Sequence, residues 1–237
     1  MKTGANGEAK RKRRKRLPVT LTEAEEAALL AQVNTKSATG LRNRALLAVM
    51  LGAGLRVGEA VALRPSDIDY STGQIFVEDG KGGKDRVVPV DAETLAHIRA
   101  WAEKRTALGF NGHRPLFCRL RRQGFGEGGV GSPMSTDNVQ ALVTRLARAA
   151  GIEKRVTPHV LRHTYACKLL RRPGAVLTDV QLALGHDHLS TTAIYLHAEP
   201  ERLRRVVQGQ DARQAQVEDL RRQLEALQAQ IAALGGE

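Results

Sequence analysis

The sequence predicts an α+β fold that is mostly helical and contains one small antiparallel sheet. Segments with helical periodicity and helix-capping residues fill most of the chain between residues 18 and 200. Only residues 74–78 and 86–90 are rich in β-branched residues, and a glycine-rich segment joins them. With 237 residues, of which 42% are hydrophobic and 26% charged, the chain is long enough to bury a substantial core.

The N-terminal residues 1–17 predict a disordered basic arm. They lack apolar periodicity and contain an unbroken basic run from Lys10 to Arg16. Such an arm could lie along phosphates, or it could be a solvated, tag-like tail. Structure is expected to begin after it, because Thr22 and Glu25 have the spacing of a capping box, which indicates a helix from Thr22 to about Val33.

The next elements are a central helix and a hairpin. A helix that starts at Leu41 is apolar on almost every side between Ala45 and Leu51, so we expect it at the centre of the fold. A turn is expected from Arg64 to Asp67. The two β-rich segments then form a hairpin, and its glycine-rich tip contains Lys81 and Lys84.

Beyond the hairpin the sequence predicts helices only. Five segments have helical patterns: residues 91–108, 135–150, 157–171, 176–184 and 190–198. Near the C-terminus, apolar residues recur at alternating intervals of three and four between Val217 and Leu234, as in a coiled coil. Because this pattern is short, residues 201–237 could form either a short coiled coil or an amphipathic helix that docks on the core.

The charge of the chain indicates a polyanionic partner. The 37 lysine and arginine residues outnumber 25 acidic residues, so the formal charge is +12. Nucleic acid is the first candidate and an anionic membrane surface the second. Aromatic residues make up only 3% of the chain, which favours double-stranded DNA over the base stacking that single strands need.

The remaining composition excludes other classes of protein. Cys118 and Cys167 form neither a disulfide framework nor a metal knuckle, and a reducing compartment fits them. No segment is apolar for long enough to span a bilayer, and the first residues lack the apolar part of a secretory signal. We therefore expect a soluble protein in the cytoplasm, without a membrane partner.

Two motifs each place an arginine beside a second polar residue. The first puts Arg56 just after the apolar helix, with Glu59 three residues later and able to orient it. In the second, Thr157 caps a helix that Pro158 begins, so that His159 and Arg162 share one face of that helix. Either motif alone is more often an ordinary surface or core feature than a site.

A third motif completes the set. The run Leu184-Gly185-His186 ends one helix, and Tyr195 follows in the next. The order and spacing of the three motifs, with a hairpin lysine between the first and the second, resemble the catalytic domain of the tyrosine recombinase (phage integrase) family. The resemblance covers roughly residues 18–200 and includes the runs 158–164 and 184–195.

This resemblance implies six catalytic residues, which are Arg56, Lys81, His159, Arg162, His186 and Tyr195. Tyr195 would be the nucleophile, and the two guanidinium groups would counter the charge that grows on a phosphodiester in the transition state. Since the ordinary pKa of tyrosine is about 10, the nucleophile needs a base, for which His159 is the candidate. His186 would donate a hydrogen bond to the phosphate.

The departing 5′-hydroxyl of DNA needs a proton donor, which a lysine on a mobile hairpin can supply. Lys81 is the expected acid and Lys84 the alternative. The family rejoins strands through a 3′-phosphotyrosyl linkage without metal or nucleotide, so we expect no cofactor. No metal-binding motif argues otherwise. His163 and Tyr165 are then expected to pack beside the site or to support it.

The implied function is that of a site-specific DNA recombinase or integrase, which exchanges strands through a four-way junction as a tetramer on paired DNA sites. A topoisomerase of type IB and a catalytically silent DNA-binding accessory protein are the alternatives. Many members of the family carry an N-terminal core-binding domain, whereas only the basic arm and one helix precede the apolar helix that leads to Arg56 here. Residues 201–237 could reach a neighbouring subunit or form a local dimer.

Overall fold

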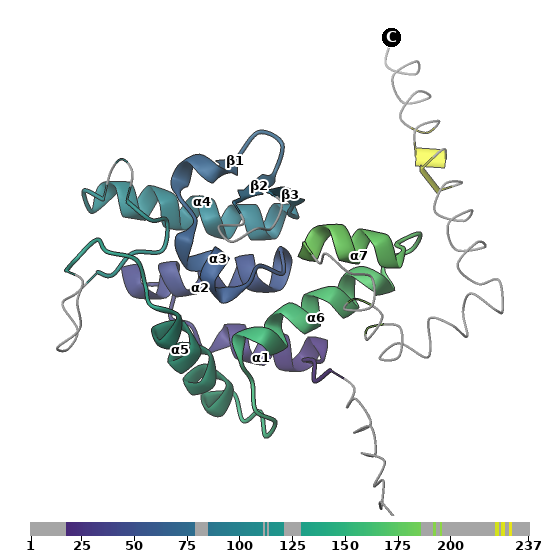
Figure 1. Cartoon of the computed structure of the whole chain (residues 1–237), viewed down its shortest axis with the longest axis horizontal. Coiled ribbons are helices and arrows are strands. Elements are labelled where there is room, and N and C mark those ends of the chain that lie inside the picture. Colours follow the sequence, from purple (N-terminus) through teal and green to yellow (C-terminus); the bar gives the residue numbers. More distant parts are fainter. Residues whose placement is uncertain are drawn as a thin grey trace, which may run out of the picture.

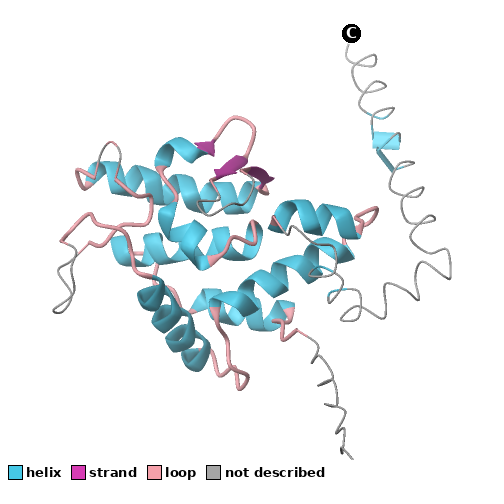
Figure 2. Cartoon of the chain, in the orientation of Figure 1, coloured by secondary structure: helices cyan, strands magenta, loops and turns pink. Residues whose placement is uncertain are grey.

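The computed structural model describes residues 18–78, 85–110, 112, 114–120, 129–185, 192, 195, 221, 222, 224, 225 and 228. These residues form a mostly helical body with a three-stranded antiparallel sheet at one edge (Figures 1 and 2). The predicted fold class is therefore confirmed. The predicted basic arm, residues 1–17, and most of residues 201–237 lie outside the described residues.

The described elements follow one another in the order α1 (Glu23–Ala31), α2 (Ala38–Gly52), α3 (Val57–Ala62), η1 (Pro65–Asp67), β1 (Ile68–Asp69), β2 (Gln74–Val77), β3 (Arg86–Pro89), α4 (Ala92–Ala107), α5 (Thr136–Ala149), α6 (Pro158–Arg171) and α7 (Leu177–Leu184). The sequence predicts neither α3 nor β1, because elements of six and two residues are too short to show a period. Of the predicted helix 190–198, the structure describes Thr192 and Tyr195, and both are helical.

Polar capping residues set where the helices begin. The Thr22 hydroxyl accepts a hydrogen bond from the Glu25 amide (3.2 Å), and the Glu25 carboxylate accepts one from the Thr22 amide (2.7 Å), as the capping box predicts. At the starts of α4, α5 and α6, the side chains of Asp91, Ser135 and Thr157 each accept a hydrogen bond from one amide of the first turn. Each cap satisfies an amide that has no partner inside its own helix.

Helix α2 runs through the centre of the described body (Figure 1). Every side chain from Ala45 to Leu51 is buried, and α2 packs against both α4 and α6. Helix α4 adds the only tryptophan of the chain, Trp101, which is fully buried and donates from Nε1 to the Leu116 carbonyl (2.8 Å). No described helix combines the length and the apolar character that crossing a membrane requires.

The sheet joins the helical body through its inner face. Ile75, Val77 and Val88 are buried in the core, whereas Phe76 and Val87 pair across β2 and β3 and are exposed. Side chains alternate along a strand, so Arg86, two residues before Val88, also belongs to the inner face. There β3 meets α7. A separate apolar cluster forms between α6, α7 and Tyr195.

Replacing Gly54 by alanine is expected to destabilise the fold by about 2–4 kcal/mol. Gly54 has a φ of +63°, and a Cβ at this position would lie 2.2 Å from Cδ1 of Tyr165. Urea unfolding measures the loss. Gly58→Ala is the control, because nothing lies within 4 Å of its Cβ position and alanine favours α3. Equal stability of the two variants would contradict the expected close contact.

Candidate active site

The first motif builds a charged cluster around Glu59. Arg56 precedes α3, and its Nη1 lies 2.8 Å from Oε1 of Glu59, while its backbone amide donates to Oε2 (2.7 Å). The predicted orientation of Arg56 by Glu59 is therefore confirmed. The Arg56 side chain is 40% exposed, whereas that of Glu59 is 8% exposed. Glu59 thus holds an accessible guanidinium from a buried position.

Arg86 of β3 is a second partner of Glu59. Its Nη1 and Nη2 lie 3.0 and 2.7 Å from the two carboxylate oxygens, and its side chain is 8% exposed. Burial of Glu59 opposes its ionisation, but the hydrogen bonds from Arg86 and from the Arg56 amide outweigh burial, so the pKa of Glu59 is lowered. Glu59 is therefore a carboxylate at neutral pH.

The second motif brings Arg162 into the same cluster from α6. Arg162 is 5% exposed, and its Nη1 lies 2.7 Å from the Gly54 carbonyl and 3.8 Å from Oε2 of Glu59. Burial, followed by repulsion from Arg56, lowers the pKa of Arg162 to about 10. The guanidinium keeps its charge at neutral pH. Arg56 and Arg162, far apart in sequence, therefore meet at one carboxylate.

The C-terminal end of α7 joins these three arginines. Three consecutive backbone carbonyls each accept a hydrogen bond from a different arginine. The Ala183 carbonyl accepts from Nε of Arg86 (3.0 Å), and the Leu184 carbonyl accepts from Nη2 of Arg162 (2.6 Å). The Gly185 carbonyl accepts from Nη2 of Arg56 (3.2 Å). Carbonyls at the end of a helix lack intrahelical donors and carry partial negative charge, so cations suit them. We call Arg56, Arg86 and Arg162 with Glu59 the arginine cluster.

A cleft of about 600 Å³ opens beside the arginine cluster and is lined in part by Arg56, Glu59, Phe76 and His159. His159 lies exposed in the first turn of α6, whose cap and first proline are as predicted. Arg162 follows one turn later but is buried. The predicted pair thus shares one helix in two different environments, with His159 at the open side of the site.

Tyr195 lies behind Arg162, against α6 and α7. Its side chain is 1% exposed, and its hydroxyl lies 2.8 Å from Nδ1 of His163. Burial raises the pKa of Tyr195 to about 12, although the positive charge of Arg162 lowers it. Burial, followed by His159 and Arg162, lowers the pKa of His163. Both groups are therefore neutral at neutral pH, and the phenol donates to Nδ1 when the imidazole carries its proton on Nε2.

His163 is the functional candidate that the sequence analysis placed only in a supporting role. It follows His159 by four residues, so both histidines project from the same side of α6. They differ in that His159 is exposed beside the cleft, whereas His163 is partly buried and contacts Tyr195. His163 thereby becomes a second candidate for the base that the sequence analysis assigns to His159.

The structure brings together four of the six predicted site residues. Arg56 and Arg162 meet at Glu59, His159 lines the cleft beside them, and Tyr195 is close enough for the Arg162 charge to act on it. Lys81 and His186, like the alternative Lys84, lie outside the described residues. Among the described residues, no group of three or more histidine, cysteine or acidic side chains is placed to hold a metal ion.

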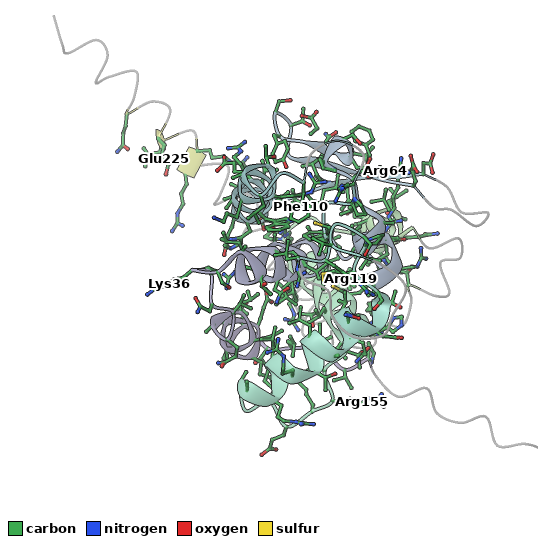
Figure 3. The ribbon with its side chains drawn as sticks, turned by 90° about the vertical axis from the view of Figure 1, so that its left-hand side faces the viewer. Lys36, Arg64, Phe110, Arg119, Arg155 and Glu225 are labelled. Carbon is green, nitrogen blue, oxygen red and sulfur yellow. The ribbon has the colours of Figure 1, made fainter. Side chains whose placement is uncertain are left out.

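A second cleft, of about 640 Å³, lies between the start of α2 and α5. Arg42, Arg119 and Arg145 line it together with Asp137, among others. Figure 3 views the side of the molecule on which α5 lies, with Arg119 labelled above this helix and Arg155 labelled below it. Cations therefore gather on this part of the surface as well as at the arginine cluster.

Arginines that meet from separate segments beside a buried tyrosine match the arrangement expected for the catalytic domain of a tyrosine recombinase. Residues 19–202 match the phage integrase family, and the chain belongs to this family. The resemblance inferred from the sequence is therefore confirmed.

Named relatives agree with this assignment. The tyrosine recombinase XerD of Ralstonia nicotianae is 41% identical over 191 residues, which are 80% of this chain and 59% of that protein. XerC of Xanthomonas campestris pv. campestris is 38% identical over 192 residues, 81% of this chain and 55% of that protein. The chain thus spans little more than half the length of these relatives.

Solved structures show the same fold. The XerA recombinase aligns with a TM-score of 0.69 at 32% identity, covering 82% of this chain and 66% of that chain. The XerH site-specific recombinase bound to palindromic difH substrate aligns with a TM-score of 0.65 at 28% identity, covering 81% of this chain and 53% of that chain.

Proposed function

We propose that this protein is a site-specific DNA recombinase of the tyrosine class. It cuts and rejoins duplex DNA through a 3′-phosphotyrosyl intermediate and a four-way junction, without metal or ATP, and it assembles as a tetramer on paired sites in the nucleoid. The observation that carries the proposal is the convergence of Arg56 and Arg162 on Glu59, with Tyr195 next to Arg162. The names of the relatives support the same activity.

The cluster has the charge that this reaction needs. Three guanidinium groups face one carboxylate, so the cluster retains positive charge where a phosphodiester would bind. Arg56, which is the most exposed of the three, would contact a non-bridging oxygen from the cleft, and Arg162 would support it from below. Such preorganised charge stabilises the additional negative charge of the transition state.

The proton of the nucleophile would leave through the contact already present. As the Tyr195 oxygen forms its bond to phosphorus, its proton passes to Nδ1 of His163, and the bond between phosphorus and the DNA 5′-oxygen breaks. Lys81 or Lys84 would protonate that oxygen, and His186 would donate to the phosphate. Because Tyr195 is only 1% exposed, DNA can reach its hydroxyl only if the α6–α7 cluster opens on the side away from His163.

The cleft lined by Arg42, Arg119 and Arg145 supports double-stranded DNA as the partner. Cations spaced along a surface bind the phosphate backbone and release its counterions. The XerH structure contains a recombinase bound to its DNA substrate, which supports the same kind of partner here.

The proposal is tested with nicked suicide substrates, which trap the covalent intermediate. The protein is incubated with duplexes drawn from the DNA that flanks its gene, and the peptide attached to DNA is identified by mass spectrometry. We expect attachment at Tyr195 without added metal. Relaxation of supercoiled plasmid by the isolated monomer at arbitrary sites would assign a type IB topoisomerase instead. DNA binding without any adduct would favour the silent accessory protein.

Adduct formation is expected to depend on pH through His163. Its lowered pKa means that the imidazole is neutral above the ordinary value of about 6.5 and becomes protonated only at lower pH. The rate should therefore be constant above pH 6.5 and fall as the pH drops through the folded-state pKa. The stability that this neutral histidine contributes is lost over the same range, since the unfolded chain binds the proton more tightly.

Two variants test which histidine causes the fall in rate at low pH. His163→Gln should remove this inflection of the pH–rate profile and slow adduct formation by about 100-fold, whereas His159→Gln should retain the inflection. Rates are measured with saturating DNA while circular dichroism monitors the fold. An inflection that survives in His163→Gln and disappears in His159→Gln would return the role of base to His159.

A further inference from the structure

Arg86 is the arginine of the cluster that the sequence does not predict. Two of its nitrogens bind the two oxygens of Glu59, and its third binds the Ala183 carbonyl. Its side chain also lies against Gly185, where an added Cβ would be 3.1 Å from Cδ of Arg86. All the nitrogens of this guanidinium are therefore engaged with protein atoms, and only 8% of the side chain is exposed.

These contacts connect three segments that each carry a proposed site residue. Arg86 follows the hairpin tip with Lys81 and Lys84 and fixes the start of β3. Through Glu59 it holds Arg56, and through Ala183 and Gly185 it holds the turn that leads to His186. A planar guanidinium with forked donors can hold a carboxylate and a carbonyl at once, which an ammonium group cannot do with the same geometry.

We propose that Arg86 is a positioning residue of the active site, which aligns Arg56 through Glu59 and fixes the α7 turn before His186. It touches neither the phosphate nor the nucleophile. The expected effect of Arg86 on the rate of adduct formation rests on the proposed function. Its effect on the α7 turn concerns the protein without DNA and does not depend on that function. Without Arg86, Glu59 would be a buried carboxylate with one cationic partner fewer, and it would pull Arg56 and Arg162 out of position.

The central experiment compares Arg86→Ala with Arg105→Ala. Arg105 is a matched control, because it is 3% exposed and binds the carbonyls of Arg114 and Pro115 far from the cluster. With saturating DNA, Arg86→Ala should form the Tyr195 adduct about 100-fold more slowly and bind DNA with affinity close to that of the unmodified protein. Arg105→Ala should lose stability and keep its rate of adduct formation.

Chemical rescue separates positioning from a general loss of stability. Methylguanidinium at millimolar concentration should enter the space left in Arg86→Ala and raise the adduct rate at least tenfold, with no effect on Arg105→Ala. Arg86→Lys, which keeps the charge and folds more readily, should have an intermediate rate. Combining Arg86→Ala with Glu59→Gln should slow the reaction no further than the slower single variant, because the two residues act as a unit.

A structural measurement keeps the inference testable even without activity. Amide hydrogen exchange at Gly185, whose N–H donates to the Leu182 carbonyl, should be at least tenfold faster in Arg86→Ala and unchanged in Arg105→Ala. Unchanged exchange, or an adduct rate in Arg86→Ala equal to that of Arg105→Ala, would overturn the inference. Absence of any adduct with the unmodified protein would contradict the proposed function, and the exchange result would then decide the inference separately.

Discussion

Tyr195→Phe is expected to abolish the covalent protein–DNA adduct and to leave the affinity for DNA within about twofold. Phenylalanine keeps the ring that fills the cluster between α6 and α7 but lacks the oxygen that attacks phosphorus. The loss of its contact with His163 should cost about 1 kcal/mol of stability. Gel separation of the adduct and a mobility-shift assay measure the two properties.

Tyr165→Phe is the matched control for this variant. Tyr165 belongs to the same apolar cluster and is 7% exposed, and burial raises the pKa of its phenol as well. Because its ring faces Gly54 rather than His163, we expect the control to form the adduct at the normal rate. An adduct that persists in Tyr195→Phe and disappears in Tyr165→Phe would move the nucleophile to Tyr165.

Arg162→Ala is expected to slow adduct formation by about 1,000-fold and to destabilise the protein by about 2–4 kcal/mol. Two causes combine in this variant. The cluster loses a charge beside the proposed phosphate site, and the carbonyls of Gly54 and Leu184 lose their donor. Single-turnover kinetics with saturating DNA measure the first effect, and urea unfolding measures the second.

Arg105→Ala again supplies the comparison, since its loss of stability should be similar and its adduct rate normal. Arg162→Lys should recover part of the rate but little of the stability, because one ammonium cannot reach both carbonyls with the original geometry. An Arg162→Ala protein that reacts at the normal rate would exclude Arg162 from the chemistry and leave it a purely structural role.

Much of the fold could be predicted from the sequence because its signals are local. The capping box at Thr22 and the cap at Thr157 depend on spacings of a few residues, and the apolar run of α2 is long enough to show that it is buried. Helix α3 and strand β1 could not be predicted, because tertiary contacts rather than periodicity define such short elements.

In the site, too, local contacts could be predicted from the sequence and tertiary contacts could not. The pairing of Arg56 with Glu59 is visible three residues apart in sequence. The roles of Arg86 and His163 depend on partners that are far away in the chain: Arg86 binds Ala183, and His163 meets Tyr195. One signal for Arg86 was present, since a cation on the inner face of a strand needs a buried partner. The sequence does not indicate which partner that is.

The acceptors at the end of α7 are main-chain atoms, which every amino acid supplies. Evolution can therefore exchange the side chains at positions 183 and 184 without changing what Arg86 and Arg162 bind, provided that the helix end keeps its shape. Covariation between positions, which detects matched side chains, would not register this link. In related sequences we expect this link to appear instead as invariance of the three arginines and of Gly185, where the backbone has a φ of +63°.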